Sequence, residues 1–345
     1  MMTRGGERAK HMRAGKLPTE LLSQLLDKVE ISDPRVFLGP RPGEDAALID
    51  FGDRYLAAKT DPVTFATDLI GWYTVQVNAN DLAVMGATPR WLMVTLLLPE
   101  GTEPGVVEDI FGQLRQASSA LGVTLVGGHT EVTYDLPRTI AVGVMLGEVD
   151  KDRVVMTSGA RPGDAIVLSK GIAIEGTALL AREAGEKLRR AGVEADVIER
   201  ARDLLFSPGI SVVRDAEVAC RAVAVHSMHD PTEGGLATGL LEVAMGANIG
   251  LLVDAGRIPV LPECRIVCEA LGLDPLGLIG SGALLATLDP SEAPQLIEAL
   301  AEDGIHAYEI GRVTPPEEGL RLLTSEGLRD LPVFERDELA RFLAQ

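Results

Sequence analysis

Five acidic side chains stand where a strand ends or a helix begins, each beside glycine, proline or asparagine. Carboxylate and amide oxygens are hard ligands that suit Mg²⁺, which proteins bind through one or two carboxylates plus substrate phosphates. Neighbouring glycines let backbone N–H groups approach phosphate oxygens. The pattern therefore indicates a site for a metal ion and a phosphate group. The five are Asp45 in Gly43-Glu44-Asp45-Ala46-Ala47, Asp61 in Lys59-Thr60-Asp61-Pro62, Asp81 in Asn78-Ala79-Asn80-Asp81, Glu131 in Gly127-Gly128-His129-Thr130-Glu131, and Asp230 in His229-Asp230-Pro231-Thr232-Glu233-Gly234-Gly235.

Asp81 is the least ordinary of the five, because it lies in an apolar segment. Residues 66–86 are mostly apolar and predict a buried helix. Asn78 and Asp81 are three residues apart, so they share one face of that helix. Polar groups in an apolar helix must find partners or line a site. We therefore expect Asp81 to belong to a functional site.

Each of the other motifs also has a structural interpretation when taken alone. Asp61 before Pro62 is typical of a turn, and Gly127-Gly128 of a tight turn. Asp230 followed by Pro231 is typical of a helix N-cap with proline at the first helical position. His226 and His229 are three residues apart, so a zinc site is an alternative for that pair.

Common nucleotide-binding and hydrolytic motifs are absent from the sequence. It contains no G-x-x-x-x-G-K-[ST], which excludes a P-loop enzyme, and no H-E-x-x-H or G-x-S-x-G. Gly280-Ser281-Gly282 lacks a third glycine at the spacing of a dinucleotide-binding fold.

Strand-like and helix-like segments alternate in both halves of the chain, and many strands read as antiparallel. This favours an α+β fold over a doubly wound parallel sheet. The composition shifts near residues 150–163, where we place a domain boundary. We predict a flexible basic arm (1–17), an N-terminal domain (18–152), a C-terminal domain (153–314) and a tail with a short helix (315–345).

The 345 residues include 32 Lys and Arg and 51 Asp and Glu, for a net charge of −19. Such a field repels DNA, RNA and anionic membranes, so we expect neither nucleic acid nor membrane as a partner. The longest apolar run, residues 91–98, is too short to cross a bilayer, and no signal-peptide pattern precedes it. Three cysteines without zinc-finger spacing indicate reduced thiols and a cytoplasmic protein.

In their order along the chain, the five motifs resemble the aminoimidazole ribonucleotide (AIR) synthetase, or PurM-like, superfamily. The resemblance covers roughly residues 38–313. It is strongest to the hydrogenase expression/formation protein HypE and its relatives, on the segments Asn80–Ala87, Leu168–Gly176 and Asp230–Leu236.

The resemblance implies an N-terminal α+β domain that pairs with a second subunit to close a β-barrel, and a C-terminal α+β domain. It implies a homodimer that binds ATP with Mg²⁺ between the domains and phosphorylates a carbonyl-type oxygen or another small acceptor. Such catalysis requires positioned phosphates and neutralised charge rather than a protein nucleophile. Carried over by position, the implied residues are Asp45, Asp61, Asp81 and Glu131 for Mg²⁺, Lys59, Asn80, Gly127, Gly128 and Thr130 for ATP, and Asp81, Asp45 and Asp230 for catalysis.

Two features depart from the family pattern. Glu44 stands where members often have aspartate, and the sequence ends Arg341-Phe342-Leu343-Ala344-Gln345 where HypE proteins carry Pro-Arg-Ile-Cys. We therefore expect a separate acceptor, a small molecule or a protein. Two alternatives stay open: HypE-type hydrogenase maturation on a thiol supplied by a partner, and a non-catalytic regulatory protein that binds ATP.

Overall fold

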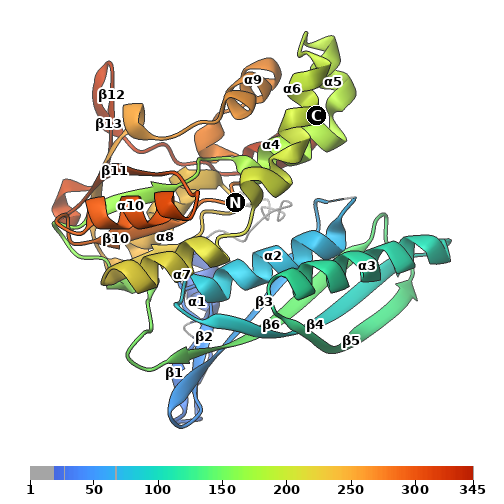
Figure 1. The fold of residues 1–345 in the computed structure, drawn as a ribbon, viewed down its shortest axis with the longest axis horizontal. Helices are drawn as coiled ribbons and strands as arrows, with labels where there is room; N and C mark the ends of the chain where they lie inside the picture. Colours follow the sequence, from blue (N-terminus) through green and yellow to red (C-terminus); the bar gives the residue numbers. More distant parts are fainter. Residues whose placement is uncertain (1–18, 27, 67, 345) are drawn as a thin grey trace, which may run out of the picture.

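The computed structural model describes residues 19–344 except residues 27 and 67. The arm predicted at residues 1–17 lies outside the described residues. Two mixed sheets, each packed with helices, divide the described chain (Figure 1). The predicted α+β class is confirmed.

The first sheet has six strands in the order β1-β2-β3-β6-β4-β5. Neighbours are antiparallel except β4 and β5, which run parallel. Helices α2 and α3 lie over one face of this sheet (Figure 1). The elements of this part are α1 (Thr19–Leu26), β1 (Val36–Leu38), β2 (Ala47–Asp50), β3 (Arg54–Val63), α2 (Ile70–Ala83), β4 (Thr88–Pro99), α3 (Pro104–Ala120), β5 (Thr124–Thr133) and β6 (Ile140–Asp150).

The second sheet has seven strands in the order β13-β12-β9-β11-β7-β10-β8. Only the β12–β9 pair is parallel. Its elements are η1 (Thr157–Gly159), β7 (Ala165–Ser169), α4 (Ile174–Glu183), α5 (Gly185–Arg190), α6 (Ala195–Asp203), η2 (Leu205–Gly209), α7 (Val213–Ala222), β8 (Val225–His229), α8 (Gly235–Ala247), β9 (Gly250–Asp254), η3 (Ala255–Arg257), α9 (Pro262–Leu271), η4 (Pro275–Gly277), β10 (Leu285–Leu288), α10 (Ala293–Glu302), β11 (Ala307–Thr314), η5 (Pro316–Glu318), β12 (Leu320–Thr324), β13 (Gly327–Asp330) and α11 (Glu338–Leu343).

Two local features shape the elements, and one segment differs from its expected form. Gly192, with a positive φ of 88°, separates α5 from α6. Strand β5 reaches Thr133 because it pairs with β4 along its length. Residues 315–345, expected as a tail, add β12 and β13 to the second sheet before the short helix α11.

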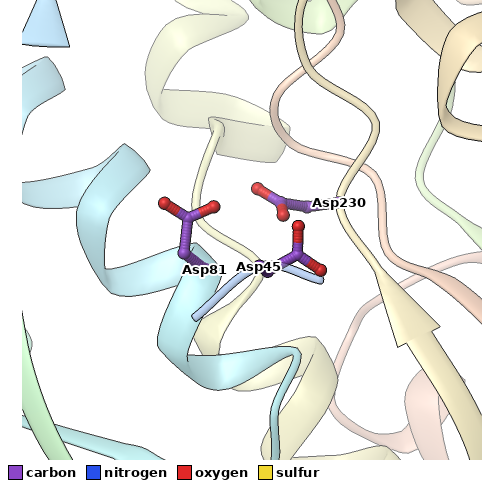
Figure 2. Close-up of side chains that lie close together, drawn as sticks. All are labelled: Asp45, Asp81 and Asp230. Atoms are coloured by element: carbon purple, nitrogen blue, oxygen red, sulfur yellow. The ribbon is translucent and has the colours of Figure 1, made fainter. Parts of the chain in front are cut away.

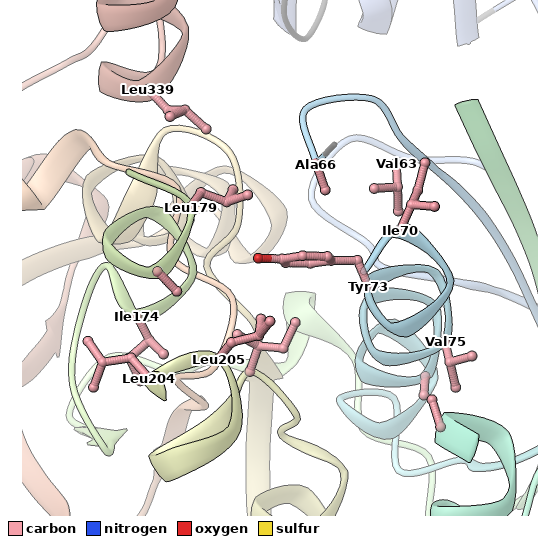
Figure 3. Packing of buried hydrophobic residues seen from close by; sticks show 14 of the residues in the cluster. Val63, Ala66, Ile70, Tyr73, Val75, Ile174, Leu179, Leu204, Leu205 and Leu339 are labelled. Atoms are coloured by element: carbon pink, nitrogen blue, oxygen red, sulfur yellow. The ribbon is translucent and has the colours of Figure 1, made fainter. Parts of the chain in front are cut away.

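One apolar core joins the two halves. Figure 3 shows Tyr73 of α2 extending toward Leu179 of α4 and Leu205 of η2. All three side chains are buried in the same cluster, which also includes Leu339 of α11. Burying this apolar surface holds the halves together and fixes α2 between them. Among the described helices, none combines the length and apolar character of a membrane span.

Candidate active site

Asp45, Asp81 and Asp230 converge from three distant segments (Figure 2). One carboxylate oxygen from each lies within 4.8 Å of the others, and all three side chains are buried. Asp45 lies two residues before β2, Asp81 lies in the last turn of α2, and Asp230 directly follows β8. The site therefore draws two ligand candidates from the first half of the chain and one from the second.

Helix α2 positions Asp81 because two asparagines anchor the helix on both sides. The Asn78 side chain donates to the carbonyl of Thr74 (2.9 Å) and accepts from the backbone N–H of Asp61 (3.0 Å), which ties α2 to β3. The Asn80 side chain donates to Ile210 O and accepts from Val212 N, both at 2.8 Å. The amide of Asn80, expected near the nucleotide, thus docks α2 on the second half of the chain.

Lys59 supplies positive charge to the cluster. Its Nζ lies 3.2 Å from Asp81 Oδ2. Burial disfavours the ammonium, but the carboxylates of Asp81, Asp45, Asp61 and Asp230 outweigh that effect and raise the pKa of Lys59. Lys59 therefore stays protonated and offers a fixed cation to an anionic ligand.

The carboxylates carry more negative charge than Lys59 can offset. Burial raises the pKa of Asp81 to about 7, although Lys59 opposes the shift. Burial, and then the charges of Asp81 and Asp45, raise the pKa of Asp230 well above its ordinary value. A divalent cation would relieve this repulsion and hold the carboxyls ionised.

Asp230 gives the clearest indication that the cluster fits a cation. Neither of its buried oxygens has a hydrogen-bond partner within the described part of the chain. A buried acceptor without a donor costs free energy, and native structures rarely leave one unexplained. Oxygen ligands of this kind match the preference of Mg²⁺.

Glu44 caps a turn and is occupied by backbone donors. Its two oxygens accept from the N–H groups of Thr157 (3.1 Å) and Ser158 (3.2 Å) in η1. The glutamate, where family members often have aspartate, uses its additional methylene to reach these donors. Its neighbour Asp45 is left as the ligand candidate of this segment.

His226 and His229 do not form a common metal site. Three residues apart on strand β8, they point to opposite faces. His226 Nδ1 lies 2.9 Å from Asp164 Oδ1, whereas His229 lies between Asp45 and Glu242. Burial opposes its charge, but the two carboxylates raise the pKa of His229 well above its ordinary value.

Asp61 and the segment Gly127–Glu131 lie apart from each other. Asp61 on β3 is close enough for its charge to raise the pKa of Asp81, although it lies outside the group of three. In strand register Asp61 aligns through Gly143 and Val94 with Gly128 on the edge strand β5. Three strand spacings amount to about 14 Å.

The glycine-rich segment lines a hollow of its own. Gly127, Gly128 and Thr130, with Phe111 and Leu114 of α3, border a hollow of about 400 Å³. Glu131, expected as a metal ligand, is exposed on β5 and pairs with His129 at 3.1 Å. Within one chain, the described structure thus keeps the glycines and Glu131 apart from the carboxylate cluster.

The sequence pattern described as AIR synthase related protein, N-terminal domain, matches residues 43–149, and that of the C-terminal domain matches residues 161–322. The chain belongs to the AIR synthase-related family. It is 30% identical over 335 residues to a Methanocaldococcus jannaschii protein provisionally named hydrogenase expression/formation protein, covering 94% of this chain and 96% of that one. It is 31% identical to the carbamoyl dehydratase HypE of Rhodobacter capsulatus, covering 82% of each.

Solved structures of HypE superpose on about nine-tenths of the chain. A crystal structure of the hydrogenase maturation protein HypE, 30% identical, aligns with a TM-score of 0.72 over 90% of this chain and 100% of the other. A HypE in complex with ATP, 27% identical, aligns with a TM-score of 0.68 over 90% and 92%. The predicted PurM-like architecture close to HypE is therefore confirmed.

Three residues that contact the site carry little sequence signal. The neighbours of Thr157 and Glu242 do not distinguish them, and the spacing of His229 from His226 suggests only a zinc ligand. The position of His229 directly before Asp230 was the one available signal. Its partner Asp45 lies 184 residues away in the sequence, so the contact arises only from the tertiary fold.

Proposed function

We propose that the protein is an Mg²⁺- and ATP-dependent enzyme that phosphorylates a carbonyl-type oxygen or another small acceptor. The observation that carries this proposal is the buried group Asp45, Asp81 and Asp230, with Lys59 beside it. Clustered oxygen ligands next to a fixed ammonium suit a metal-bound polyphosphate. Transfer of its terminal phosphoryl group depends on positioning and charge neutralisation. The relatives support the reaction class, since one is named carbamoyl dehydratase and another was solved with ATP.

In this proposal, Asp45, Asp81 and Asp230 hold Mg²⁺, with Asp61 nearby. The cation supplies charge neutralisation and orients the terminal phosphates. Lys59 then stabilises negative charge on the transferred phosphoryl group. The acceptor oxygen bonds to the γ-phosphorus, the bond to the β–γ bridging oxygen breaks, and ADP leaves with that electron pair. Once phosphorylated, the acceptor oxygen becomes a good leaving group, as a dehydration requires.

We further propose a homodimer formed through the first sheet. β5 has one unpaired edge, and both β4 and β5 carry exposed apolar side chains. Trp91 and Met93 are exposed on the face of β4 opposite its buried residues Leu92 and Val94, and Leu125, Val126 and Val132 are exposed on the edge strand β5. An apolar sheet face with an open edge is typical of an interface. If the first sheets of two copies pack together, they would form the β-barrel expected for the family.

The dimer also bears on ATP binding. Because three strand spacings separate Gly128 from Asp61 within one chain, we propose that Gly127, Gly128, Thr130 and Glu131 reach the nucleotide from the β5 edge of the second copy. Each site would then combine the carboxylates of one copy with the glycines of the other. We place this dimer in the cytoplasm, because its three cysteines are free.

A second candidate is carbamoyl dehydration on the thiol of a partner protein, favoured by the names of the relatives. Cys264 and Cys268 are buried in the core, so neither offers an accessible thiol.

The proposed function is tested by ADP release. The purified protein is incubated with ATP, with and without Mg²⁺, alone and with carboxylate, amide and carbamoyl-thioester acceptors. We expect Mg²⁺-dependent ADP release that one acceptor class stimulates. Nucleotide binding with no turnover under any condition would instead support the non-catalytic alternative.

A further inference from the structure

We propose that His229 is a positioning residue that orients Asp45 as a metal ligand and thereby sets the affinity of the carboxylate cluster for a divalent cation. This inference rests on the proposed function, because it requires the cluster to bind a metal. It assigns a role to His229, a residue that is not itself proposed to bind the metal.

Two donors converge on one oxygen of Asp45. His229 Nδ1 lies 3.0 Å from Asp45 Oδ2, and the Thr157 hydroxyl donates to the same oxygen at 3.2 Å. Rotation of the carboxylate would break both bonds together. With Oδ2 engaged in this way, we assign metal ligation to Oδ1. Hydrogen bonds of this kind orient ligands at metal sites and are a large part of their affinity.

The imidazole ring is itself held on its other side. His229 Nε2 lies 3.1 Å from Glu242 Oε2 on α8, and the ring is buried. Because each nitrogen faces a carboxylate, both act as donors, and the bonds are charge-assisted. The chain Asp45–His229–Glu242 therefore fixes the ring plane as well as the carboxylate.

This arrangement connects the two halves of the molecule at the metal site. Asp45 lies between β1 and β2 of the first sheet, whereas His229, Glu242 and Thr157 all belong to the second half. The adjacent Gly43 has a positive φ of 87°, and a Cβ there would lie 2.9 Å from the carbonyl oxygen of Glu242. The loop before β2 is therefore fitted closely against α8, and Asp45 takes its position from residues of the other half.

The two ring nitrogens can be tested separately. An asparagine amide nitrogen occupies about the position of Nδ1, and a glutamine amide nitrogen about that of Nε2. His229→Asn therefore keeps a donor for Asp45 and loses the bond to Glu242, whereas His229→Gln does the reverse. A merely structural histidine gives no reason for these two variants to differ in metal affinity.

The experiment measures Mn²⁺ binding to the nucleotide-free full chain by calorimetry, with a thermal melt of each variant. We expect His229→Asn to bind within about threefold of the wild type and His229→Gln to bind about 10–100-fold more weakly. Thr157→Val, which removes the other donor to Oδ2, should weaken binding several-fold even if the glutamine variant fails to fold. Equal affinities for the asparagine and glutamine variants, or unchanged binding by Thr157→Val, would overturn the inference.

The wild type and Asp230→Asn separate this inference from the proposed function. Wild-type binding that Asp230→Asn abolishes supports the metal site, whatever the His229 variants do. A wild type that binds no Mn²⁺ overturns the site, and with it the role of His229.

Discussion

Lys59 Nζ lies 3.2 Å from Asp81 Oδ2, so β3 and α2 are joined by an ion pair inside the carboxylate cluster. The cluster is short of positive charge, because the four carboxyl groups of Asp45, Asp61, Asp81 and Asp230 surround the single ammonium group of Lys59. A metal-bound phosphate brings both the missing cation and an anion for Lys59 to contact.

Asp81→Asn should abolish ATP turnover without unfolding the protein. The substitution removes a ligand charge but also a buried carboxyl whose pKa is raised to about 7 by burial. We expect Mg²⁺-dependent ADP release to fall by about 100-fold or more, with a melting temperature equal to or above the wild type. Asp53→Asn, on an exposed side chain, is the matched control and should leave both values unchanged. Unchanged turnover and Mg²⁺-ATP affinity in Asp81→Asn would refute the assignment.

Glu175→Gln should flatten the dependence of stability on pH. Burial raises the pKa of Glu175 from 4.5 to about 7, with Ser281 opposing the shift through hydrogen bonds. Between those values the unfolded chain has lost this proton and the folded chain keeps it, so stability falls as pH rises from about 4.5 to 7. The whole effect is at most about 3 kcal/mol.

Urea unfolding at pH 5, 6, 7 and 8 measures the effect of Glu175. The free energy of unfolding of Glu175→Gln, relative to the wild type, should increase as pH rises, and the variant should be the more stable protein at pH 8. Glu298→Gln, an exposed carboxyl on α10, should follow the wild-type curve. Parallel curves for wild type and Glu175→Gln would contradict the prediction.

Gly128→Ala should lower stability, whereas Gly127→Ala should weaken ligand binding without a loss of stability. Gly128 has a φ of 148°, and a Cβ there would lie 2.0 Å from the carbonyl oxygen of Val94, whereas a Cβ at Gly127 meets nothing within 4 Å. Gly128→Ala should cost about 1–3 kcal/mol of folding free energy. Gly127→Ala should keep stability within about 0.5 kcal/mol yet weaken binding of a non-hydrolysable ATP analogue. An alanine at 127 that binds the analogue like wild type would remove this glycine from the nucleotide site.

Val126→Lys should convert the dimer to a monomer. Val126 is exposed on the edge strand β5, where a lysine opposes pairing with a second copy. Light scattering at micromolar concentration measures the mass, and Val333→Lys, an exposed site in the second half, is the control. A wild type that is monomeric, or a Val126→Lys variant that remains dimeric, would count against the interface.

Mixing two variants that are each impaired in turnover tests whether the copies share a site. If each site combines the carboxylates of one copy with the glycines of the other, refolded mixtures of Asp81→Asn and Gly127→Ala should regain part of the wild-type turnover. Mixtures that stay at the level of the separate variants would place both groups in one chain.

The sequence anticipated the features that depend on local chemistry. Asp81 was conspicuous because a carboxylate in an apolar helix needs a partner, and α2 (Ile70–Ala83) is indeed buried between sheet and second half. Asp45 and Asp230 were marked by flanking glycine and proline. That the three side chains meet depends on the packing of α2 against residues near 210, which no local pattern encodes.

Features that depend on strand order cannot be predicted from local sequence patterns. Glu131 follows two glycines, as a phosphate-site residue would, but β5 is an edge strand three positions from β3, so within one chain Glu131 lies apart from the carboxylate cluster. No local pattern predicts the strand β12, because its parallel pairing with β9 links segments about 70 residues apart. The role of Glu44 was open from the sequence, since only the position of η1 supplies its donors.

Calorimetric titration with a non-hydrolysable ATP analogue tests the central claim most directly, in the wild type and in Asp230→Asn, each with Mg²⁺ and with EDTA. The buried, unpartnered oxygens of Asp230 predict that the wild type binds at least tenfold more tightly with Mg²⁺, and that Asp230→Asn loses this gain. Equal affinity with Mg²⁺ and with EDTA in the wild type, or an undiminished Mg²⁺ gain in Asp230→Asn, would contradict a metal-phosphate site at these three carboxylates.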